Sequence, residues 1–203
     1  MFSKPLARLV VPFAFLTLAA LATTTAAAAS ETFNWSVQSS TAPVASCVGG
    51  GALPCSNGTV RVTYPSTQLG TDSPPFSNYP FFRQPATLTG YLDVPTSNLD
   101  PSTGCYSGVT GTFQVLVARG GGNKQRLAFE LDMNTSAYCS VGTSDVHFTS
   151  GTFAINGDNS EDPAFRRGVT GAGTFVLQDS VDFTGVNSSG FLDADFQGSI
   201  DVA

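Results

Sequence analysis

The feature that most constrains this chain is a glycine-rich stretch of alternating residues at positions 148–177. It reads F-T-S-G-T-F-A-I-N-G, then a polar insert D-N-S-E-D-P-A, then F-R-R-G-V-T-G-A-G-T-F-V-L. Phe153 and Ile155 in the first part, and Phe175 and Leu177 in the second, recur with a period of two. This period places large apolar side chains on one face of a strand. The stretch therefore predicts two β-strands joined by a loop.

Four glycines interrupt the pattern, at Gly151, Gly168, Gly171 and Gly173. Glycine weakens the interior of a strand, so such a cluster indicates bulges, sharp coiling or close approach of backbones. A small closing barrel needs glycines of this kind at its corners. We therefore expect an all-β fold, a single antiparallel β-barrel of roughly eight to ten strands. A β-sandwich with glycine-rich turns is the alternative.

The pattern G-T-F-A-I-N-G, a loop, then F-R-R-G-V-T-G-A-G-T-F resembles the hairpin of secreted bacterial β-domains with the form G-T-F-x-I-x-G…F-x-x-x-x-G-x-G-T-F. It is also distantly similar to the matching segment of the allene oxide cyclase and dirigent barrel families. The resemblance covers Gly151 to Phe175, and this chain replaces a compact glycine loop with the acidic insert Gly157 to Pro163. The shared motif carries no catalytic group. It therefore implies a barrel fold and little about function.

Other segments alternate in the same way, at 32–38, 59–64, 86–94, 109–118 and 125–133. A segment from Pro65 to Pro85 is different, because it holds five prolines and has no apolar period. We interpret it as a long Pro-rich loop, and loops of this length are often functional or disordered. Its aromatic residues are candidates for a ligand-binding surface, because aromatic side chains dominate interface energetics. These candidates are Phe76, Tyr79, Phe81 and Phe82; alternatively, they fold down onto one end of the core.

Residues 1–29 have the form of a secretory signal peptide. Lys4 and Arg8 precede an apolar core, and three alanines offer a cleavage site before Ser30. The apolar run is too short for a membrane span. We therefore expect one secreted all-β domain over residues 30–203, extracellular, or periplasmic if the host is Gram-negative.

The acidic balance of the remaining chain limits its partners. Without Lys4 and Arg8, seven Lys and Arg face fifteen Asp and Glu, a net charge of −8. This charge argues against binding to nucleic acid or to anionic membranes.

Four cysteines follow the signal segment, and an even number in an exported chain predicts two disulfides. Three pairings are possible, and we favour Cys47 with Cys55 and Cys105 with Cys139, since each closes a local loop. Loop-closure entropy assigns roughly 2–3 kcal/mol to the shorter bridge and about 3–4 kcal/mol to the longer one. The tight cysteine and histidine spacing of a zinc site is absent, and we expect no metal or cofactor.

Catalytic candidates are few. His147 is the single histidine and lies two positions from Asp145, a pair that could act as a general base beside a nucleophilic serine. The chain has no G-x-S-x-G motif to supply that serine. A lone histidine on a strand is more often structural. For a cyclase or isomerase, Asp145 or Arg166 could lie inside the barrel.

Three functions stay open on these residues. The first is a non-catalytic secreted β-domain that binds a small ligand or a cell-surface component. The second is a cyclase or isomerase of the allene oxide cyclase or dirigent kind. The third is a structural or adhesive protein that presents the aromatic residues of the Pro-rich loop. The oligomeric state is not predicted.

Overall fold

We describe a computed structural model of the chain, in which residues 29–71, 86–118, 124–141, 145–166, 168–184 and 190–202 are placed. Within these ranges, eleven strands form one antiparallel sheet. The eight long strands are β1 (Ala29–Ser39), β3 (Thr59–Thr71), β4 (Ala86–Pro95), β7 (Thr110–Ala118), β8 (Gln125–Ser140), β9 (Val146–Asn156), β10 (Thr170–Ser180) and β11 (Leu192–Val202). The short elements are β2 (Val44–Cys47), β5 (Leu99–Asp100), β6 (Cys105–Tyr106), the 3-10 turn η2 (Thr96–Asn98) and the helix α1 (Pro163–Arg166).

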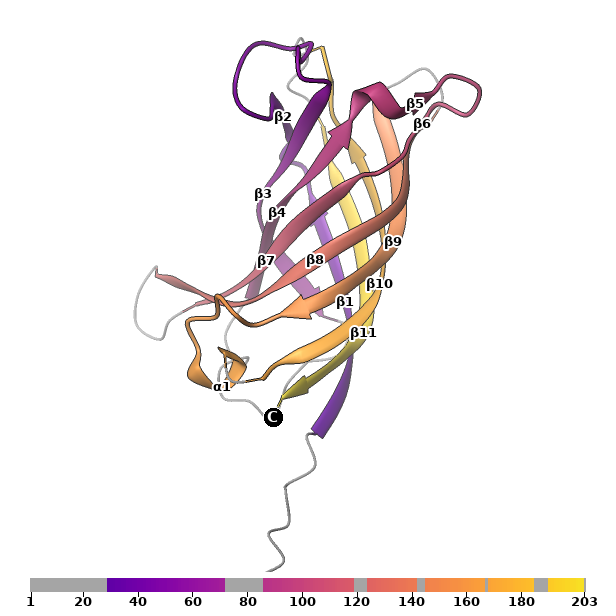
Figure 1. The fold of residues 1–203 in the computed structure, drawn as a ribbon. Helices are drawn as coiled ribbons and strands as arrows, with labels where there is room; N and C mark the ends of the chain where they lie inside the picture. The colour runs from indigo at the N-terminus through magenta and orange to yellow at the C-terminus, as the bar shows by residue number, and fades with distance from the viewer. Residues whose placement is uncertain are drawn as a thin grey trace, which may run out of the picture.

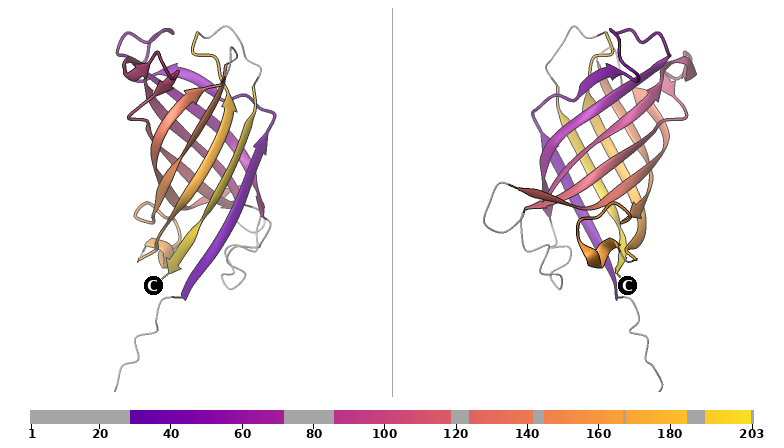
Figure 2. Two further views of the ribbon diagram at one scale, coloured as in Figure 1. Left: turned by 90° about the vertical axis from the view of Figure 1, so that its right-hand side faces the viewer. Right: turned by 60° about the vertical axis from the view of Figure 1, so that its left-hand side comes forward.

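The eight long strands close into a barrel. Their order is β8-β7-β4-β3-β1-β11-β10-β9, and the pairing of β9 with β8 completes the ring. Figures 1 and 2 show tilted strands around one axis, with α1 and the C-terminus at one end and β2, β5 and β6 at the other. The closed ring confirms the expected barrel and excludes the β-sandwich alternative.

Glycine and phenylalanine face each other repeatedly across neighbouring strands. In the hairpin that the sequence singled out, Gly151 pairs with Phe175, and Gly173 pairs with Phe153. Elsewhere Gly90 pairs with Phe113, and Gly198 pairs with Phe33. All four phenylalanines are buried. An aromatic ring that covers a cross-strand glycine stabilises a sharply curved sheet. This pairing explains why glycine and phenylalanine recur together in the motif.

Aromatic side chains fill the barrel interior. Successive ring contacts, with centroids 4.0–6.1 Å apart, lead from one end of the barrel toward the other. In order, the rings belong to Phe165, Phe129, Trp35, Phe33, Phe153, Phe196, Phe113 and Tyr64. Phe165 belongs to α1, so this helix closes its end of the barrel by packing an aromatic ring on Phe129. The interior along this path is a packed core.

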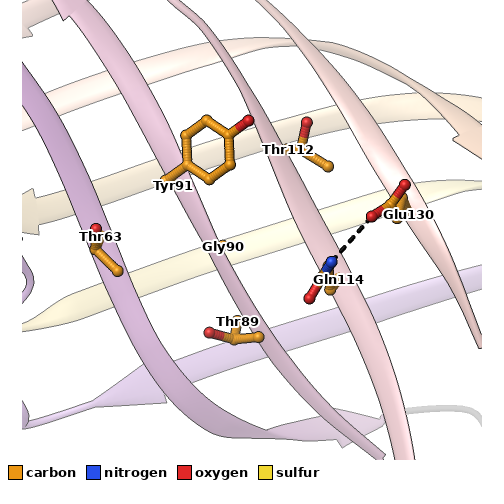
Figure 3. A pocket seen from close by; sticks show the side chains of 7 residues that line it. All are labelled: Thr63, Thr89, Gly90, Tyr91, Thr112, Gln114 and Glu130. Carbon is orange, nitrogen blue, oxygen red and sulfur yellow. Dashed lines mark hydrogen bonds between the residues drawn. The ribbon is translucent and has the colours of Figure 1, made fainter. Parts of the chain in front are cut away.

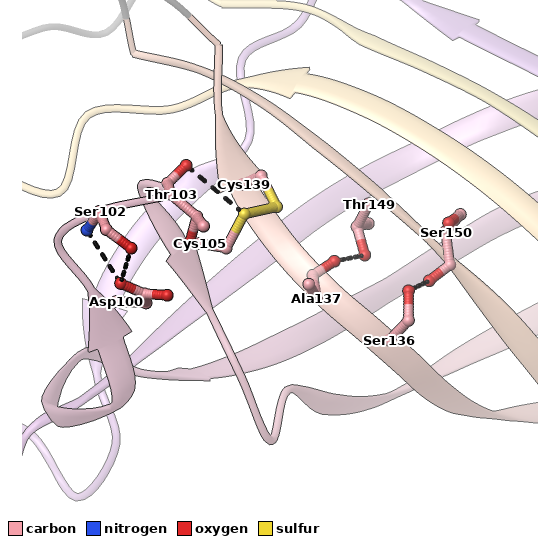
Figure 4. The surroundings of a disulfide bond; sticks show 9 residues. All are labelled: Asp100, Ser102, Thr103, Cys105, Ser136, Ala137, Cys139, Thr149 and Ser150. Atoms are coloured by element: carbon pink, nitrogen blue, oxygen red, sulfur yellow. Dashed lines mark hydrogen bonds between the residues drawn. A yellow bond between two sulfur atoms is a disulfide. The ribbon is translucent and has the colours of Figure 1, made fainter.

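Both disulfides join the predicted partners, Cys47 with Cys55 and Cys105 with Cys139. The second bridge links directly paired residues of β6 and β8. Figure 4 shows it beside a bulge in β8, where Thr149 and Ser136 donate hydrogen bonds to backbone carbonyls across the β8–β9 pair. The bridge and these hydrogen bonds fasten the end of the barrel at which β9 begins.

The shorter bridge offers a first prediction. The variant Cys47→Ala/Cys55→Ala opens a closure of 8 residues, and its unfolding free energy should fall by about 2–3 kcal/mol because the unfolded chain gains loop entropy. Denaturant titration checks this value. The barrel strands do not depend on this loop, so far-ultraviolet circular dichroism of the folded variant should match the native protein. A loss of native dichroism would show that the bridge is needed to form the barrel.

The predicted boundary of the Pro-rich loop was wrong at its beginning. Strand β3 continues to Thr71, and Leu69 is buried and pairs with Val37 of β1. A register shift between Tyr64 and Thr67 accommodates Pro65, because a bulge is one of the few positions in a sheet that tolerates proline. The rest of the predicted loop, including Phe76, Tyr79, Phe81 and Phe82, lies outside the described residues.

Candidate functional site

A group of polar side chains lies buried inside the barrel, toward the end at which β6 pairs with β8. It consists of Tyr64 on β3, Tyr138 on β8, His147 on β9 and Asp179 on β10, and we call it the Asp179 cluster. Tyr64, Tyr138 and Asp179 are fully buried, and 5% of the surface of His147 is exposed. Four different strands therefore contribute one polar group each.

Asp179 is the centre of this cluster. The hydroxyl of Tyr64 donates a hydrogen bond to Oδ2 at 2.5 Å. The hydroxyl of Tyr138 donates to the same carboxylate, 2.8 Å from Oδ1 and 2.9 Å from Oδ2. Hydrogen bonds of this kind to a buried carboxylate are short and strong, so they hold β3, β8 and β10 together across the interior.

His147 lies against the same carboxylate. Its Nδ1 is 3.5 Å from Oδ1 of Asp179 and has no hydrogen-bond partner among the described residues. The imidazole is nearly parallel to the ring of Tyr138, at a centroid distance of 4.6 Å, and to the ring of Phe183, at 5.0 Å. These rings fix the plane of the imidazole and leave Nδ1 directed at Asp179.

Burial and the neighbouring charge of Asp179 raise the pKa of both phenols well above its ordinary value. For Tyr64 and for Tyr138, desolvation is the largest cause. Both side chains therefore stay protonated in the folded protein at pH values at which they ionise in the unfolded chain.

This shift predicts lower stability in alkali. Above about pH 10 the unfolded state loses phenolic protons that the folded state keeps, so the unfolding free energy falls as pH rises. The slope contributed by each buried tyrosine approaches about 1.4 kcal/mol per pH unit. Denaturant titrations between pH 8 and 11 measure it. The variant Tyr64→Phe should show a smaller slope than the native protein.

The structure separates the residues that the sequence grouped as catalytic candidates. His147 points into the barrel and is buried, whereas Asp145 is exposed. The carboxylate that lies beside His147 is that of Asp179. Arg166 is exposed at the end of α1, where its guanidinium donates two hydrogen bonds to the backbone oxygen of Ser160. The expectation that Asp145 or Arg166 could lie inside the barrel was therefore wrong, because both side chains are exposed.

A second candidate site lies on the outer face of the barrel. It is an open groove of about 480 Å³ that crosses β3, β4, β7 and β8, and we call it the outer groove. Its lining is made of Thr63, Thr89, Gly90, Tyr91, Thr112, Gln114 and Glu130 (Figure 3). Gly90 lies between the side chains of the other residues, and a Cβ added there would lie 2.6 Å from the ring of Phe113. The absence of a side chain at Gly90 lets the core ring pack directly beneath the groove.

Hydrogen bonds and a cation fix the polar groups at the groove. Gln114 donates to one oxygen of Glu130 at 2.9 Å, and Asn159 donates to the other at 2.8 Å. Arg61 lies over the ring of Tyr91 at 3.9 Å and makes a bidentate ion pair with Asp93, both distances being 2.7 Å. The positive charge next to the groove is thus already paired.

Sequence reasoning missed Asp179 and the outer groove. The parity of β10 could have indicated Asp179, because it continues the inward series of Phe175 and Leu177. The groove has no such signal, since its residues come from four strands whose register only the closed barrel defines.

Three further observations limit the candidates. Comparison with protein family models, with curated proteins and with solved structures finds no match for this chain. In the described ranges, no three His, Cys, Asp or Glu side chains gather as metal ligands. No helix among the described residues is long and apolar enough to cross a membrane.

Proposed function

We propose that this chain is a secreted, non-catalytic β-barrel that binds a small neutral carbohydrate of a cell surface in the outer groove. The observation that carries the proposal is the groove itself, an open site of about 480 Å³ lined by hydroxyl, amide and carboxylate groups and one aromatic ring. Its volume falls in the range of small-molecule sites.

The lining favours a sugar over other small ligands. Three threonines, Gln114 and Glu130 offer donors and acceptors for hydroxyl groups, and Tyr91 offers its hydroxyl and a ring of which Arg61 covers one face. A lipid chain would need an enclosed apolar site, whereas this groove is open. An anionic ligand would need a free cation, but Arg61 is engaged by Asp93, and the carboxylate of Glu130 borders the groove. Neutral polyhydroxylated ligands match this combination of groups.

Secretion rests on the signal-like segment 1–29 and on the two disulfides. A low share of charged residues, 12%, also fits an extracellular β-protein. An extracellular location would bring the outer groove into contact with surface glycans.

Binding to an array of neutral, amino and acidic glycans tests the proposal. We expect retention of neutral glycans by the native protein, and the variant Tyr91→Ala should weaken it at least about tenfold, since an aromatic contact contributes on the order of 1 kcal/mol or more with its buried area. Phe148→Ala is the matched control, because Phe148 is an exposed aromatic on β9, outside the groove lining. Failure to bind any glycan, or equal loss in both variants, would contradict the proposal.

A cyclase or isomerase is the second candidate, and the Asp179 cluster is the observation that favours it. The phenols of Tyr64 and Tyr138 are proton donors inside a barrel, and a substrate would have to approach them from the end near Phe183, because aromatic rings fill the interior along the other direction. Turnover of cyclisable unsaturated compounds that is lost in Tyr138→Phe would support this function. The adhesive role of the Pro-rich loop remains a prediction, since its aromatic residues are not among those described.

A further inference from the structure

The Asp179 cluster combines three kinds of polar side chain. It brings two phenols, one carboxylate and one imidazole together inside the barrel, with three of the four side chains fully buried. Two hydrogen bonds satisfy the phenols, but Nδ1 of His147 is buried without a hydrogen-bond partner among the described residues. Buried polar atoms are rarely left without a hydrogen-bond partner. Since Nδ1 of His147 faces the carboxylate of Asp179, we infer that a ligand shared by these two groups is missing.

The spacing of the donors fits a metal coordination shell. Metal bonds to nitrogen and oxygen are about 2.0–2.2 Å, so ligands at right angles lie about 2.9 Å from each other. The phenol oxygens of Tyr64 and Tyr138 lie 2.5 to 2.9 Å from the oxygens of Asp179, and Nδ1 of His147 lies at 3.5 Å. The two phenol oxygens therefore stand at about this edge length from the carboxylate of Asp179, and Nδ1 of His147 lies farther from it.

Charge selects the kind of ion. With the carboxylate and both phenols deprotonated, the four side chains carry three negative charges, and the interior of the barrel strongly disfavours a net charge. A trivalent cation neutralises this set, whereas a divalent one neutralises the cluster only if one phenol keeps its proton. Phenolate and carboxylate oxygens are hard donors, and imidazole also binds iron, so the ligand set suits ferric iron.

We propose that Tyr64, Tyr138, His147 and Asp179 form a binding site for one ferric ion. Binding replaces the two phenolic protons: the ion enters, two oxygen–metal bonds form, and two protons leave to solvent. The sequence-based expectation of no metal site rested on cysteine and histidine spacing and did not cover tyrosine ligands. The inference does not depend on the outer groove or on carbohydrate binding.

Loading the intact, disulfide-bonded protein with ferric nitrilotriacetate tests the site. The ion is offered both to the folded protein and during refolding from denaturant, followed by desalting. We expect one iron per chain by mass spectrometry and a visible phenolate-to-iron charge-transfer band. In weakly buffered solution we also expect two protons per iron from the phenols, counted after adding back the proton that each released nitrilotriacetate takes up. The band reports phenolate ligation specifically, which adventitious iron held by surface carboxylates or precipitated as hydroxide does not produce.

Variants assign the band to the cluster. Tyr64→Phe and Tyr138→Phe should each weaken iron binding at least tenfold and reduce or abolish the band, whereas Tyr106→Phe should keep both. Tyr106 is the matched control, because it lies in the adjacent strand β6, directly paired with Tyr138, but is only partly buried and outside the cluster. Thermal unfolding of each variant verifies that it is folded.

Three results would overturn the proposal. The first is no retained iron after loading by either route. The second is iron binding or a band that persists unchanged in folded Tyr138→Phe. The third is tight binding of zinc or another divalent ion to the cluster while ferric iron is excluded. Glycan binding measured on the same samples tests the proposed function independently, so that failure of the iron site and failure of carbohydrate binding are told apart.

Discussion

Replacing Gly173 by alanine is expected to cost more than about 4 kcal/mol of unfolding free energy, a loss at the upper end for single substitutions. A Cβ at this position would lie 2.1 Å from the carbonyl oxygen of Gln197 and 2.8 Å from the Cα of Gly198. These are backbone atoms of β11, which pairs with β10 throughout this region. The clash can be relieved only by separating two barrel strands and losing their hydrogen bonds.

Denaturant titration of Gly173→Ala against Gly70→Ala measures the effect. Gly70 also lies in a strand, but the nearest atom to an added Cβ there is the hydroxyl of Ser36 at 2.8 Å, which can rotate away. The control should therefore lose much less stability than Gly173→Ala. Similar losses in the two variants would show that the cost comes from strand glycines in general and not from the close approach of β10 and β11.

The glycines of this hairpin also explain why its fold was predictable. Alternation of Phe153 with its neighbours indicated strands, and the glycines indicated curvature, so the barrel could be expected before its strands were placed. The sequence did not show that each phenylalanine of the hairpin covers a glycine of the paired strand. That relation depends on register, which a single strand does not define.

The Asp179 cluster was only partly predictable. Tyr64 continues the inward series of Val60 and Val62, and its burial follows from strand parity. Tyr138 does not follow from the alternation earlier in β8, because a bulge between Thr135 and Ala137 changes which residues point inward. His147 was a candidate as the single histidine, two positions from Asp145. The carboxylate that it contacts is instead that of Asp179, 32 residues farther along the chain.

The barrel interior has two regions, a packed aromatic core and the polar Asp179 cluster, and they contribute to stability in different ways. The continuous ring contacts account for stability along most of the interior. The polar cluster stabilises the structure only while its members satisfy each other, because burial makes any unsatisfied group costly. The cluster is therefore the place where a conservative change of one side chain should have an effect out of proportion to its volume.

Replacing Asp179 by alanine is expected to lower the unfolding free energy by about 3–5 kcal/mol, measured by denaturant titration at pH 7. The substitution removes the acceptor for two buried phenols, and neither can reach water, since Tyr64 and Tyr138 are both fully buried. The cost includes the desolvation of the orphaned donors as well as the lost hydrogen bonds. Asp179→Asn should lose less, because its amide oxygen still accepts a hydrogen bond.

A combined variant distinguishes the network from simple loss of packing. Asp179→Leu together with Tyr64→Phe and Tyr138→Phe removes the acceptor and both hydroxyl donors, and replacing a whole buried polar set with apolar groups is often close to neutral. We therefore expect the triple variant to recover at least half of the stability that Asp179→Ala loses. If the losses instead add across the three positions, the side chains act independently, and the carboxylate does not organise this end of the barrel.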